Sequence, residues 1–387
     1  MPWKESRKVD ERMKFISRYL DGETVTDLCK VFEISRKTAY KFIERFSELG
    51  TDGLHDAKRG PKTIPHKTNP SVEKLIIKLR TLRPTWGPKK IKARLEKLNP
   101  NINIPAASTI GEILNRNNIE VNLQKRRKRS ILNPYTPLTE SLAPNDVWCI
   151  DFKGQFRMGN KRYCYPLTVT DHKSRYLLGC EALPSTKRMG VVETFERVFT
   201  DFGLPKVILS DNGTPFASHG VGRLSRLSVW FLRLGINPEQ IEPGHPEQNG
   251  RHERMHRTLK AETIRPAGKN LLQQQEKFDE FMDIYNNERP HEALKMGTPN
   301  EHYQKSKIIF NNNIQEINYD LCDDIRKVSS IGRIRIPGDS MNSCFLGTAL
   351  EGEKVGLTMN KDASWEVRFM SKSLGQIIKI GHSYKLI

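Results

Sequence analysis

The chain has 387 residues, of which 36% are hydrophobic and 28% charged, and its formal net charge is +19. This length suffices for two to four domains, and no apolar run is long enough to span a bilayer. The sequence starts without the apolar stretch of a signal peptide, and its six cysteines form no Cys-x-x-Cys pair. These features exclude a membrane-spanning helix, argue against a structural zinc site and favour reduced thiols in the cytoplasm.

The positive charge is concentrated in the first part of the chain. Residues 1–140 hold 30 of the 64 Lys and Arg residues but only 16 of the 45 Asp and Glu residues. A basic block of this kind usually meets nucleic acid, because neutralising phosphates releases counterions. A solvated basic surface is the alternative, and charge alone does not exclude it.

Residues 11–49 have the pattern of three short helices. Two short helices, a tight turn and a basic third helix predict a helix-turn-helix, and the alternative is a three-helix bundle that binds nothing. We expect Tyr40, Ile43 and Phe46 on the third helix to face the core. The residues expected to face DNA are Arg36, Lys37, Thr38 and Lys41.

Two basic linkers flank a second helical segment. This segment is a weaker helix-turn-helix candidate, because its last helix, which Ser108 is expected to cap, carries little positive charge. The first linker is rich in Gly, Pro and Lys and is expected to follow the DNA backbone or minor groove through Lys58, Arg59 and Lys62. The second linker opens with a run that would attract phosphate: Lys125, Arg126, Arg127, Lys128 and Arg129. A nuclear import signal is the rival interpretation of that run, but it needs a eukaryotic setting that nothing else suggests.

Strand and helix patterns alternate through residues 145–305. The predicted strands are Val147–Phe152, Cys164–Thr170, Leu177–Leu183 and Lys206–Leu209, the first three forming an antiparallel meander. The predicted helices are Gly190–Phe202, Ser225–Leu234, Arg251–Thr263 and Leu271–Asn286. Three strands followed by alternating helices and strands predict a mixed sheet with helices on both faces.

Short β segments dominate after Ile308. They are Ile331–Ile336, Ser343–Leu346, Lys354–Thr358, Trp365–Met370 and Leu374–Ile378, separated by Gly, Asp and Asn. We expect a small five-stranded β-barrel, which could bind DNA or bridge subunits. The expected division is a helix-turn-helix domain (1–54), a linker (55–69), a second helix-turn-helix domain (70–124), a linker (125–144), an α/β core (145–308) and the barrel (309–387).

Three acidic residues of the core stand in settings suited to metal chemistry. Asp151 ends one apolar strand pattern, Asp211 follows another in Ser-Asp-Asn-Gly, and Glu253 opens a basic helix. If the two strands are neighbours, the helix would bring Glu253 against the two aspartates. Three carboxylates cannot share one site as bare anions, so they need metal. Two Mg²⁺ or Mn²⁺ ions would activate a water or 3′-hydroxyl and stabilise the leaving oxygen of a phosphodiester.

The motifs around these acids resemble a known family. Trp148-x-x-Asp151, Asp211-Asn212-Gly213, the run from Pro246 through Asn249-Gly250-x-x-Glu253 to Lys260, and Tyr285-Asn286-x-x-Arg289-Pro290-His291 are similar to the integrase core of bacterial insertion-sequence transposases. That family belongs to the retroviral-integrase superfamily. The resemblance implies an RNase H-like fold for residues 145–308 with a mixed five-stranded sheet. It also implies that Asp151 bridges two metal ions, that Asp211 and Glu253 each hold one, and that DNA is cleaved and joined by direct transesterification.

The third acid has a competitor in Glu247. Between Asp211 and Glu247 lie 35 residues, the spacing typical of retroviral integrases, whereas 41 lie between Asp211 and Glu253. The local motif favours Glu253, because the family glutamate follows Asn-Gly by three residues and opens the helix. We therefore predict Glu253 as the ligand and place Glu247 in a loop.

Other residues of this region are expected to contact DNA. Arg257 and Lys260 lie one and two turns beyond Glu253 and should hold phosphates, unless they are ordinary solvent-facing charges. The predicted contacts here are Asn249, Arg254, Arg257 and Lys260. His245 and His252 are interpreted as DNA contacts or surface residues, because hard cations prefer oxygen. Arg289-Pro290-His291 is interpreted as a structural turn.

These features together predict a DNA transposase in the bacterial cytoplasm. It would bind the terminal repeats of a mobile element and hold two double-stranded DNA ends at once, as a dimer or larger assembly, without a membrane partner. A non-catalytic DNA-binding regulator is a rival that would have lost the carboxylates. A nuclease of the same fold is another rival, but it would not need two helix-turn-helix domains.

Overall fold

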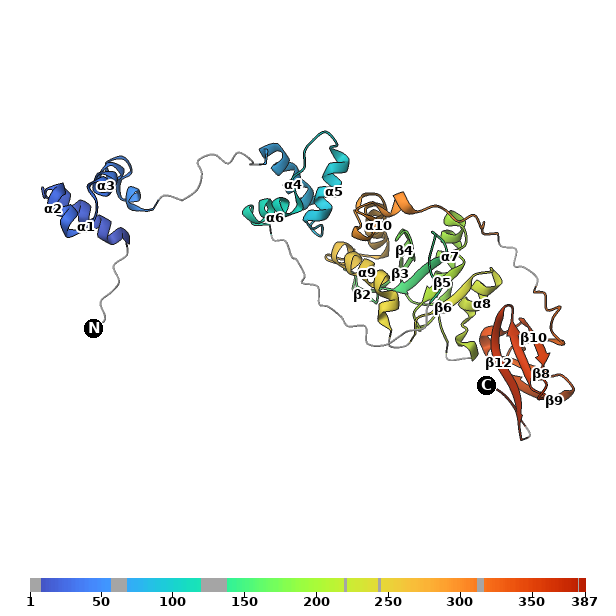
Figure 1. The fold of residues 1–387 in the computed structure, drawn as a ribbon. Helices are drawn as coiled ribbons and strands as arrows, with labels where there is room; N and C mark the ends of the chain where they lie inside the picture. The colour runs from blue at the N-terminus through green and yellow to red at the C-terminus, as the bar shows by residue number, and fades with distance from the viewer. Residues whose placement is uncertain are drawn as a thin grey trace. The chain divides into compact units, whose positions relative to one another are not determined.

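The computed structural model describes residues 8–56, 68–119, 138–218, 221–242, 245–311, 317–381 and 383–387. The chain divides into two compact units, Met1–Thr68 and Asn69–Ile387, which are taken separately below (Figure 1). In the described part, no helix has the length and apolar character needed to cross a membrane.

The first unit is a three-helix bundle. Its helices are α1 (Lys8–Leu20), α2 (Val25–Val31) and α3 (Arg36–Leu49), followed by a 3₁₀ turn at Gly50–Leu54. Thr24 and Ser35 cap α2 and α3 by accepting backbone N–H groups from Asp27 and Thr38. The expected three helices are confirmed, with the tight turn between α2 and α3.

One expectation for α3 is wrong. Tyr40 is 58% exposed and does not face the core, whereas Ala39 and Phe42 are buried in it. Ile43 and Phe46 pack at the edge of that core, as expected. Each step along a helix rotates the side chain by about 100°, so the core face centred on Ala39 and Phe42 leaves Tyr40 outside it.

The second unit begins with another set of three helices, α4 (Pro70–Leu82), α5 (Pro88–Leu98) and α6 (Ala107–Arg116). Trp86, Ile91 and Ile110 are fully buried at their centre. The expected cap is wrong: Ala106 precedes α6, and Ser108 lies inside its first turn.

A mixed sheet forms the middle of the second unit. Its strands are β1 (Val147–Phe152), β2 (Phe156–Arg157), β3 (Tyr163–Asp171), β4 (Leu177–Leu183), β5 (Val207–Ser210) and β6 (Asn237–Gln240). The order β4-β3-β1-β5-β6 has antiparallel pairs up to β1 and parallel pairs beyond it, while the two-residue β2 pairs with β3. The mixed sheet and its meander are confirmed, but the sheet has six strands and not the expected five, because the two-residue β2 adds to β3. The strand β6 was missed because Asn-Pro-Glu-Gln lacks an apolar pattern.

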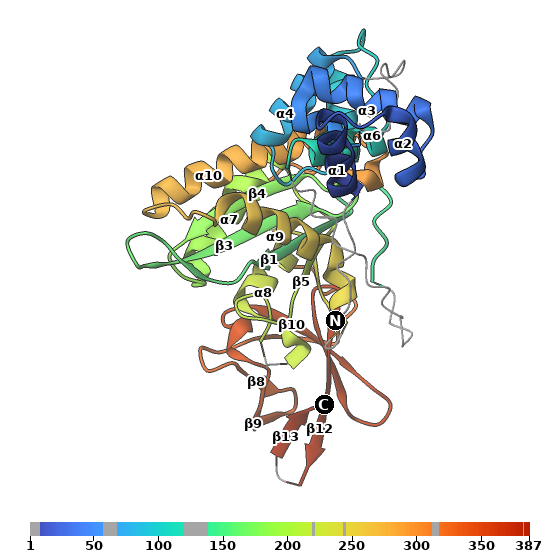
Figure 2. The ribbon, with the colours of Figure 1, turned by 90° about the vertical axis from the view of Figure 1, so that its left-hand side faces the viewer.

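Helices cover both faces of this sheet (Figure 2). They are α7 (Arg188–Phe202), α8 (Arg226–Arg233), α9 (Gly250–Thr263) and α10 (Leu271–Asp283), the last followed by a π turn at Ile284–Glu288. One core joins Trp148 and Ile150 of β1 to α7 and α8, and a second joins α9 and α10 to β3 and β4. Residues of β1 that alternate with Trp148 and Ile150 therefore point towards the opposite face.

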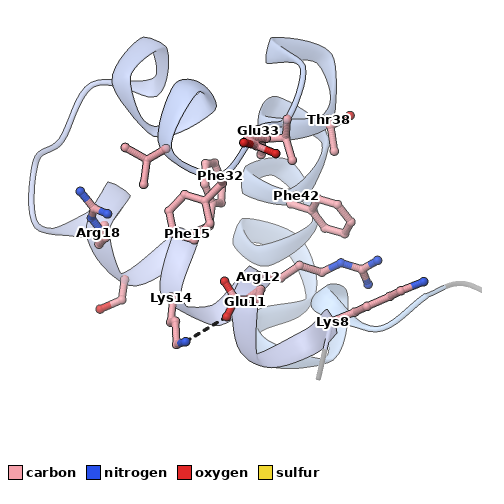
Figure 3. A pocket seen from close by; sticks show the side chains of 13 residues that line it. Lys8, Glu11, Arg12, Lys14, Phe15, Arg18, Phe32, Glu33, Thr38 and Phe42 are labelled. Carbon is pink, nitrogen blue, oxygen red and sulfur yellow. Dashed lines mark hydrogen bonds and ion pairs between the residues drawn. The ribbon is translucent and has the colours of Figure 1, made fainter. Parts of the chain in front are cut away.

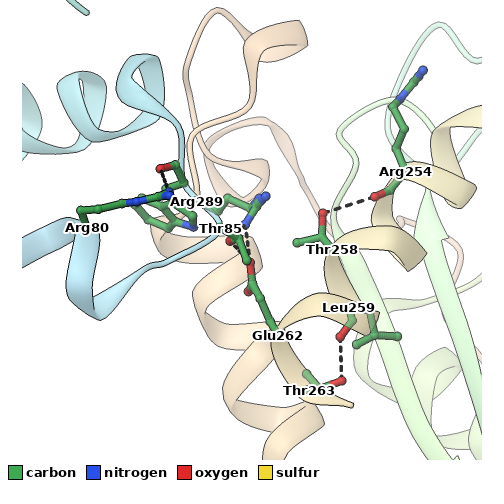
Figure 4. Close-up of polar contacts among 9 residues, drawn as sticks. Arg80, Thr85, Arg254, Thr258, Leu259, Glu262, Thr263 and Arg289 are labelled. Atoms are coloured by element: carbon green, nitrogen blue, oxygen red, sulfur yellow. Dashed lines mark hydrogen bonds and ion pairs between the residues drawn. The ribbon is translucent and has the colours of Figure 1, made fainter. Parts of the chain in front are cut away.

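Polar contacts tie α4–α6, the second helical module, to the α/β core (Figure 4). Arg289, which is buried, donates to Glu262 at 2.7 Å and to Thr85 at 3.3 Å. Arg83 and Arg94 both pair with Glu288. Ile284 adds an apolar contact to the core of the module. The predicted turn at Arg289 is thus part of an interface.

The described part of the C-terminal region contains seven strands. They are β7 (Asp324–Lys327), β8 (Arg333–Ile336), β9 (Asp339–Phe345), β10 (Lys354–Met359), β11 (Trp365–Phe369), β12 (Lys372–Ile380) and β13 (Ser383–Leu386). Five of them form an antiparallel sheet in the order β13-β12-β11-β10-β7, and β8 and β9 form a hairpin. All five predicted strands are present, but a closed five-stranded barrel is not confirmed. The sheet shares a core with Leu224, Val229 and Leu232 at α8.

Candidate active site

Two of the predicted carboxylates lie at the carboxyl ends of neighbouring strands of the sheet. β1 and β5 are parallel neighbours, with Cys149 opposite Leu209, so Asp151 and Asp211 follow at the carboxyl ends of adjacent strands. The carboxylate of Asp211 accepts the backbone N–H of Gly213 at 3.1 Å. Asn212 donates to the Ile241 carbonyl oxygen, which ties this turn to the segment after β6.

Asp151 lies in an environment that disfavours its charge. Its side chain is 19% exposed and receives a 3.4 Å contact from the amide of Asn249. Burial raises the pKa of Asp151 to about 7, with the negative charge of Asp211 as the next cause and that of Glu253 as a further one. The backbone N–H of Phe152 opposes this shift only in part. The charges of Asp211 and Glu253 thus disfavour ionisation of Asp151, and a bound cation would favour it.

Glu253 lies in the first turn of α9 and is exposed. Glu253 follows Asn249, the residue that precedes α9, by four positions, so the two residues lie on the same side of the helix at its start. Glu247 belongs to the 3₁₀ turn Pro246–Asn249 rather than to an irregular loop. The side chain of Glu247 lies outside the described part of the structure.

Two histidines of α9 pack against β3 behind Asp151. His252 and His256 are 2% and 5% exposed, so the interpretation of His252 as a surface residue or DNA contact is wrong. Nε2 of each histidine forms a hydrogen bond of 2.7 Å with the hydroxyl oxygen of Thr168. Nδ1 of His252 contacts the hydroxyl of Thr170 at 2.8 Å. Nδ1 of His256 lies 3.7 Å from Oδ2 of Asp151.

Burial keeps both histidines neutral. Desolvation lowers the pKa of His252 to about 3, and it lowers the pKa of His256 strongly, with His252 as a second cause. Asp151, His252 and His256 form a group whose potential ligand atoms lie within 4.8 Å of one another. Sequence reasoning missed His256, although the spacing His252-x-x-x-His256 puts both rings on one helical face.

The remaining predicted DNA contacts differ in their surroundings. Asn249 is buried and contacts Asp151, whereas Arg254, Arg257 and Lys260 are exposed on α9. On α3, Arg36, Lys37 and Lys41 are exposed and Thr38 is partly buried. The predicted linker contacts Lys58, Arg59 and Lys62, and the run Lys125–Arg129, lie outside the described residues.

A separate hollow of about 820 Å³ lies between α1 and α3 in the first unit (Figure 3). Phe15, Phe32 and Phe42 form its apolar part, and the guanidinium of Arg12 lies 4.4 Å from the Phe42 ring centre. The exposed cations of α3 do not line this hollow. Thr38, one of the residues predicted to face DNA, does line it, so the hollow borders the face predicted to meet DNA.

Comparison with known families agrees with this geometry. Two family models described as Integrase core domain match residues 141–246 and 234–299. The chain contains an integrase core domain over residues 141–299. A Helix-turn-helix domain matches residues 11–62 of this integrase-core protein, and a Homeodomain-like domain matches residues 38–114. Metal binding is implied by this fold, and DNA binding by the domains that precede it.

Individual relatives cover different parts of the integrase-core chain. The insertion element IS407 uncharacterized 31.7 kDa protein of Burkholderia multivorans is 24% identical over 265 residues, which are 68% of this chain and 90% of that protein. The uncharacterized protein K02A2.6 of Caenorhabditis elegans is 30% identical over 187 residues, but these are 48% of this chain and only 14% of that protein. The HTLV-2 integrase catalytic core domain in complex with magnesium shares 15% identity with a TM-score of 0.34, over 43% of this chain and all of that one. The fold assignment rests on the strand order and the family matches, not on that score.

Proposed function

We propose that the protein is a DNA transposase that binds the terminal repeats of its mobile element and catalyses metal-dependent cleavage and joining of DNA strands. The observation that carries this proposal is the placement of Asp151 and Asp211 at the carboxyl ends of the parallel neighbours β1 and β5, with the charges of Asp211 and Glu253 adding to the raised pKa of Asp151. Hard oxygen ligands gathered in this way suit divalent ions beside a polyanion. The insertion-element relative, aligned over most of its length, supports the same function.

The donor set fits two divalent ions, Mg²⁺ or Mn²⁺. Asp151, with both other acids near it, would be shared between the ions, while Asp211 and Glu253 would each hold one. When bound, the ions supply an activated water or 3′-hydroxyl and stabilise the leaving oxygen. Asn249 orients the Asp151 carboxylate through its amide group. The exposed Arg257 and Lys260 would bind phosphates next to Glu253.

The N-terminal domains would deliver the DNA. The third helix of the first unit presents Arg36, Lys37 and Lys41 to solvent, and the exposed Tyr40 lies on the same helix. In a helix-turn-helix, residues of this helix reach base edges and phosphates of the major groove. Two transposon ends must be held together for joining, so we infer a homodimer or larger assembly on DNA.

A strand-joining assay tests the function. A labelled duplex carrying the end of the element that encodes the protein is incubated with plasmid and Mg²⁺, and the label is followed into plasmid-sized products. Wild type is expected to join the duplex, and Asp151→Asn is expected to bind it without joining. Hydrolysis without joining would favour the nuclease, and binding without either reaction would favour the regulator.

A further inference from the structure

The hydrogen bonds around Thr168 assign the proton positions of both buried histidines. The Thr168 hydroxyl donates its single proton to the backbone carbonyl oxygen of Asp151 at 3.1 Å. Its lone pairs are therefore the groups that face Nε2 of His252 and Nε2 of His256. Both Nε2 atoms must carry hydrogen to bond there. With Nε2 of each ring directed at Thr168, Nδ1 is the ring nitrogen left to meet another partner.

The Nδ1 atoms of His252 and His256 differ in their partners. Nδ1 of His252 accepts the hydroxyl proton of Thr170 at 2.8 Å. Among the described residues, Nδ1 of His256 has no hydrogen-bond donor, and it faces Oδ2 of Asp151 at 3.7 Å. That separation is too long for a shared proton. Nδ1 of this buried histidine thus faces a carboxylate oxygen of Asp151, with no proton shared between the two atoms.

A divalent cation satisfies two such acceptors together. Bonds from divalent ions to imidazole nitrogen and carboxylate oxygen are about 2.0–2.2 Å long, so two ligands of one ion lie roughly 3–4 Å apart. The Nδ1 to Oδ2 distance of 3.7 Å falls in this range. The N–H of the opposite ring nitrogen is held by Thr168, the arrangement that fixes the orientation of a metal-binding imidazole.

We propose that Nδ1 of His256 and Oδ2 of Asp151 bind one divalent ion together, forming a mixed nitrogen–oxygen site that prefers a transition-metal ion such as Mn²⁺ to Mg²⁺. This inference rests on the proposed function only in taking Asp151 as a metal ligand. Imidazole raises affinity for first-row transition metals, whereas Mg²⁺ favours oxygen ligands and retains water. Selectivity between these ions is therefore the property that His256 controls.

Metal binding to the full chain, measured without DNA, tests this assignment. Mn²⁺ binding is followed by the loss of the free-ion electron paramagnetic resonance signal, and Mg²⁺ by competition, for wild type, His256→Ala and His256→Asn. Both variants should bind Mn²⁺ about 10-fold or more weakly. Their Mg²⁺ affinity should change much less, so the Mn²⁺/Mg²⁺ ratio should fall. The asparagine variant serves if the alanine variant does not fold.

His252 provides the matched control. It lies on the same helix, is equally buried and contacts the same threonine, but both its nitrogens are satisfied. His252→Ala should leave the Mn²⁺/Mg²⁺ ratio unchanged. An unchanged ratio in the His256 variants, or an equal fall in His252→Ala, would overturn the inference. If Asp151→Asn keeps full metal binding, the metal site of the proposed function itself is wrong. If Asp151→Asn loses binding while the His256 variants keep the ratio, only the inference fails.

Discussion

At the scale of single residues, the chemistry of the site is visible in the unfavourable position of Asp151. A carboxylate that is mostly buried and near two other anions keeps its proton at a higher pH than usual, with a pKa of about 7 against an ordinary 3.8. The folded protein therefore binds a proton that the unfolded chain has already released. In the absence of metal, the free energy of unfolding must fall as the pH rises from about 4 to about 7.

Replacing this carboxylate should stabilise the metal-free protein. Asp151→Asn is expected to raise the free energy of unfolding at pH 8 by on the order of 2–4 kcal/mol, with the gain shrinking towards pH 4. Urea unfolding in chelator at several pH values measures this. Asp146 is the opposite control, because Lys206 lowers its pKa and Asp146→Asn should destabilise the protein at pH 8. A gain for Asp151→Asn that is the same at pH 4 and pH 8 would contradict the assignment.

Single substitutions also test the choice between Glu253 and Glu247. Glu253→Gln should reduce strand joining by roughly 100-fold or more, because a lost metal ligand removes several kcal/mol of charge stabilisation. Glu247→Gln should leave joining near the wild-type rate. The assay is the plasmid-joining reaction described above. Loss at Glu247 with activity kept at Glu253 would reverse the choice.

The sequence allowed Asp151 and Asp211 to be predicted because each follows an apolar strand pattern that limits where its side chain can lie. It did not allow His256 to be predicted as a neighbour of Asp151. That contact depends on which face α9 turns towards β3, and the low apolar content of α9 leaves the face undetermined. The same limit explains the wrong prediction that Tyr40 faces the core, since the apolar pattern of α3 was compatible with two different buried faces.

At the scale of elements, we expect one face of α3 to stabilise the domain and another face to bind DNA. Lys37 and Lys41 are exposed and make no described ion pair, and Lys41 contacts the protein only through the edge of the core, 5.7 Å from the Phe42 ring centre, so their removal should change thermal stability little. Lys37→Ala with Lys41→Ala should weaken binding to the end of the element. It should also reduce the slope of log affinity against log salt by about 2, if each contacts one phosphate. Fluorescence anisotropy across a salt series measures this. Lys14→Ala on α1 is the control, and an equal loss there would mean that overall charge, not α3, is responsible.

The interface between the second helical module and the core depends on a buried charge. Arg289 is 8% exposed and pairs with Glu262, which is 19% exposed. Glu262→Ala should destabilise the protein by about 3 kcal/mol, because it leaves the guanidinium buried without its partner. Urea unfolding provides the measurement. The exposed pair of Lys89 and Glu292 offers a comparison, and Glu292→Ala should cost less than about 1 kcal/mol. Equal effects would mean that burial of Arg289 carries no special cost.

At the scale of the whole molecule, separate hydrophobic cores predict separate unfolding. The first unit has its own core around Phe15, Leu28 and Phe42. In the second unit, α8 contributes Leu227 and Phe231 to the core under the mixed sheet, and Val229 and Leu232 to the core of the C-terminal sheet. The composition of the C-terminal segment predicted short strands but could not predict this sharing, because it involves residues far apart in the chain.

Calorimetry should therefore resolve the unfolding of the two units. We expect one transition for residues 1–68 and one cooperative transition in which the mixed sheet and the C-terminal sheet unfold together. Leu232→Ala is expected to lower the second transition temperature and leave the first unchanged, since it removes a buried side chain from the shared region. A third transition for the C-terminal strands alone would contradict this coupling.

The position of α8 between two cores also limits how its sequence can change in length. Adding or deleting one residue rotates every later side chain of the helix by about 100°. Phe231 and Leu232 would then turn away from the cores that they now fill. A one-residue insertion or deletion within this eight-residue helix would therefore disrupt the packing of both sheets at once. Length variation among relatives should therefore be found in the connections on either side of α8 and not within it.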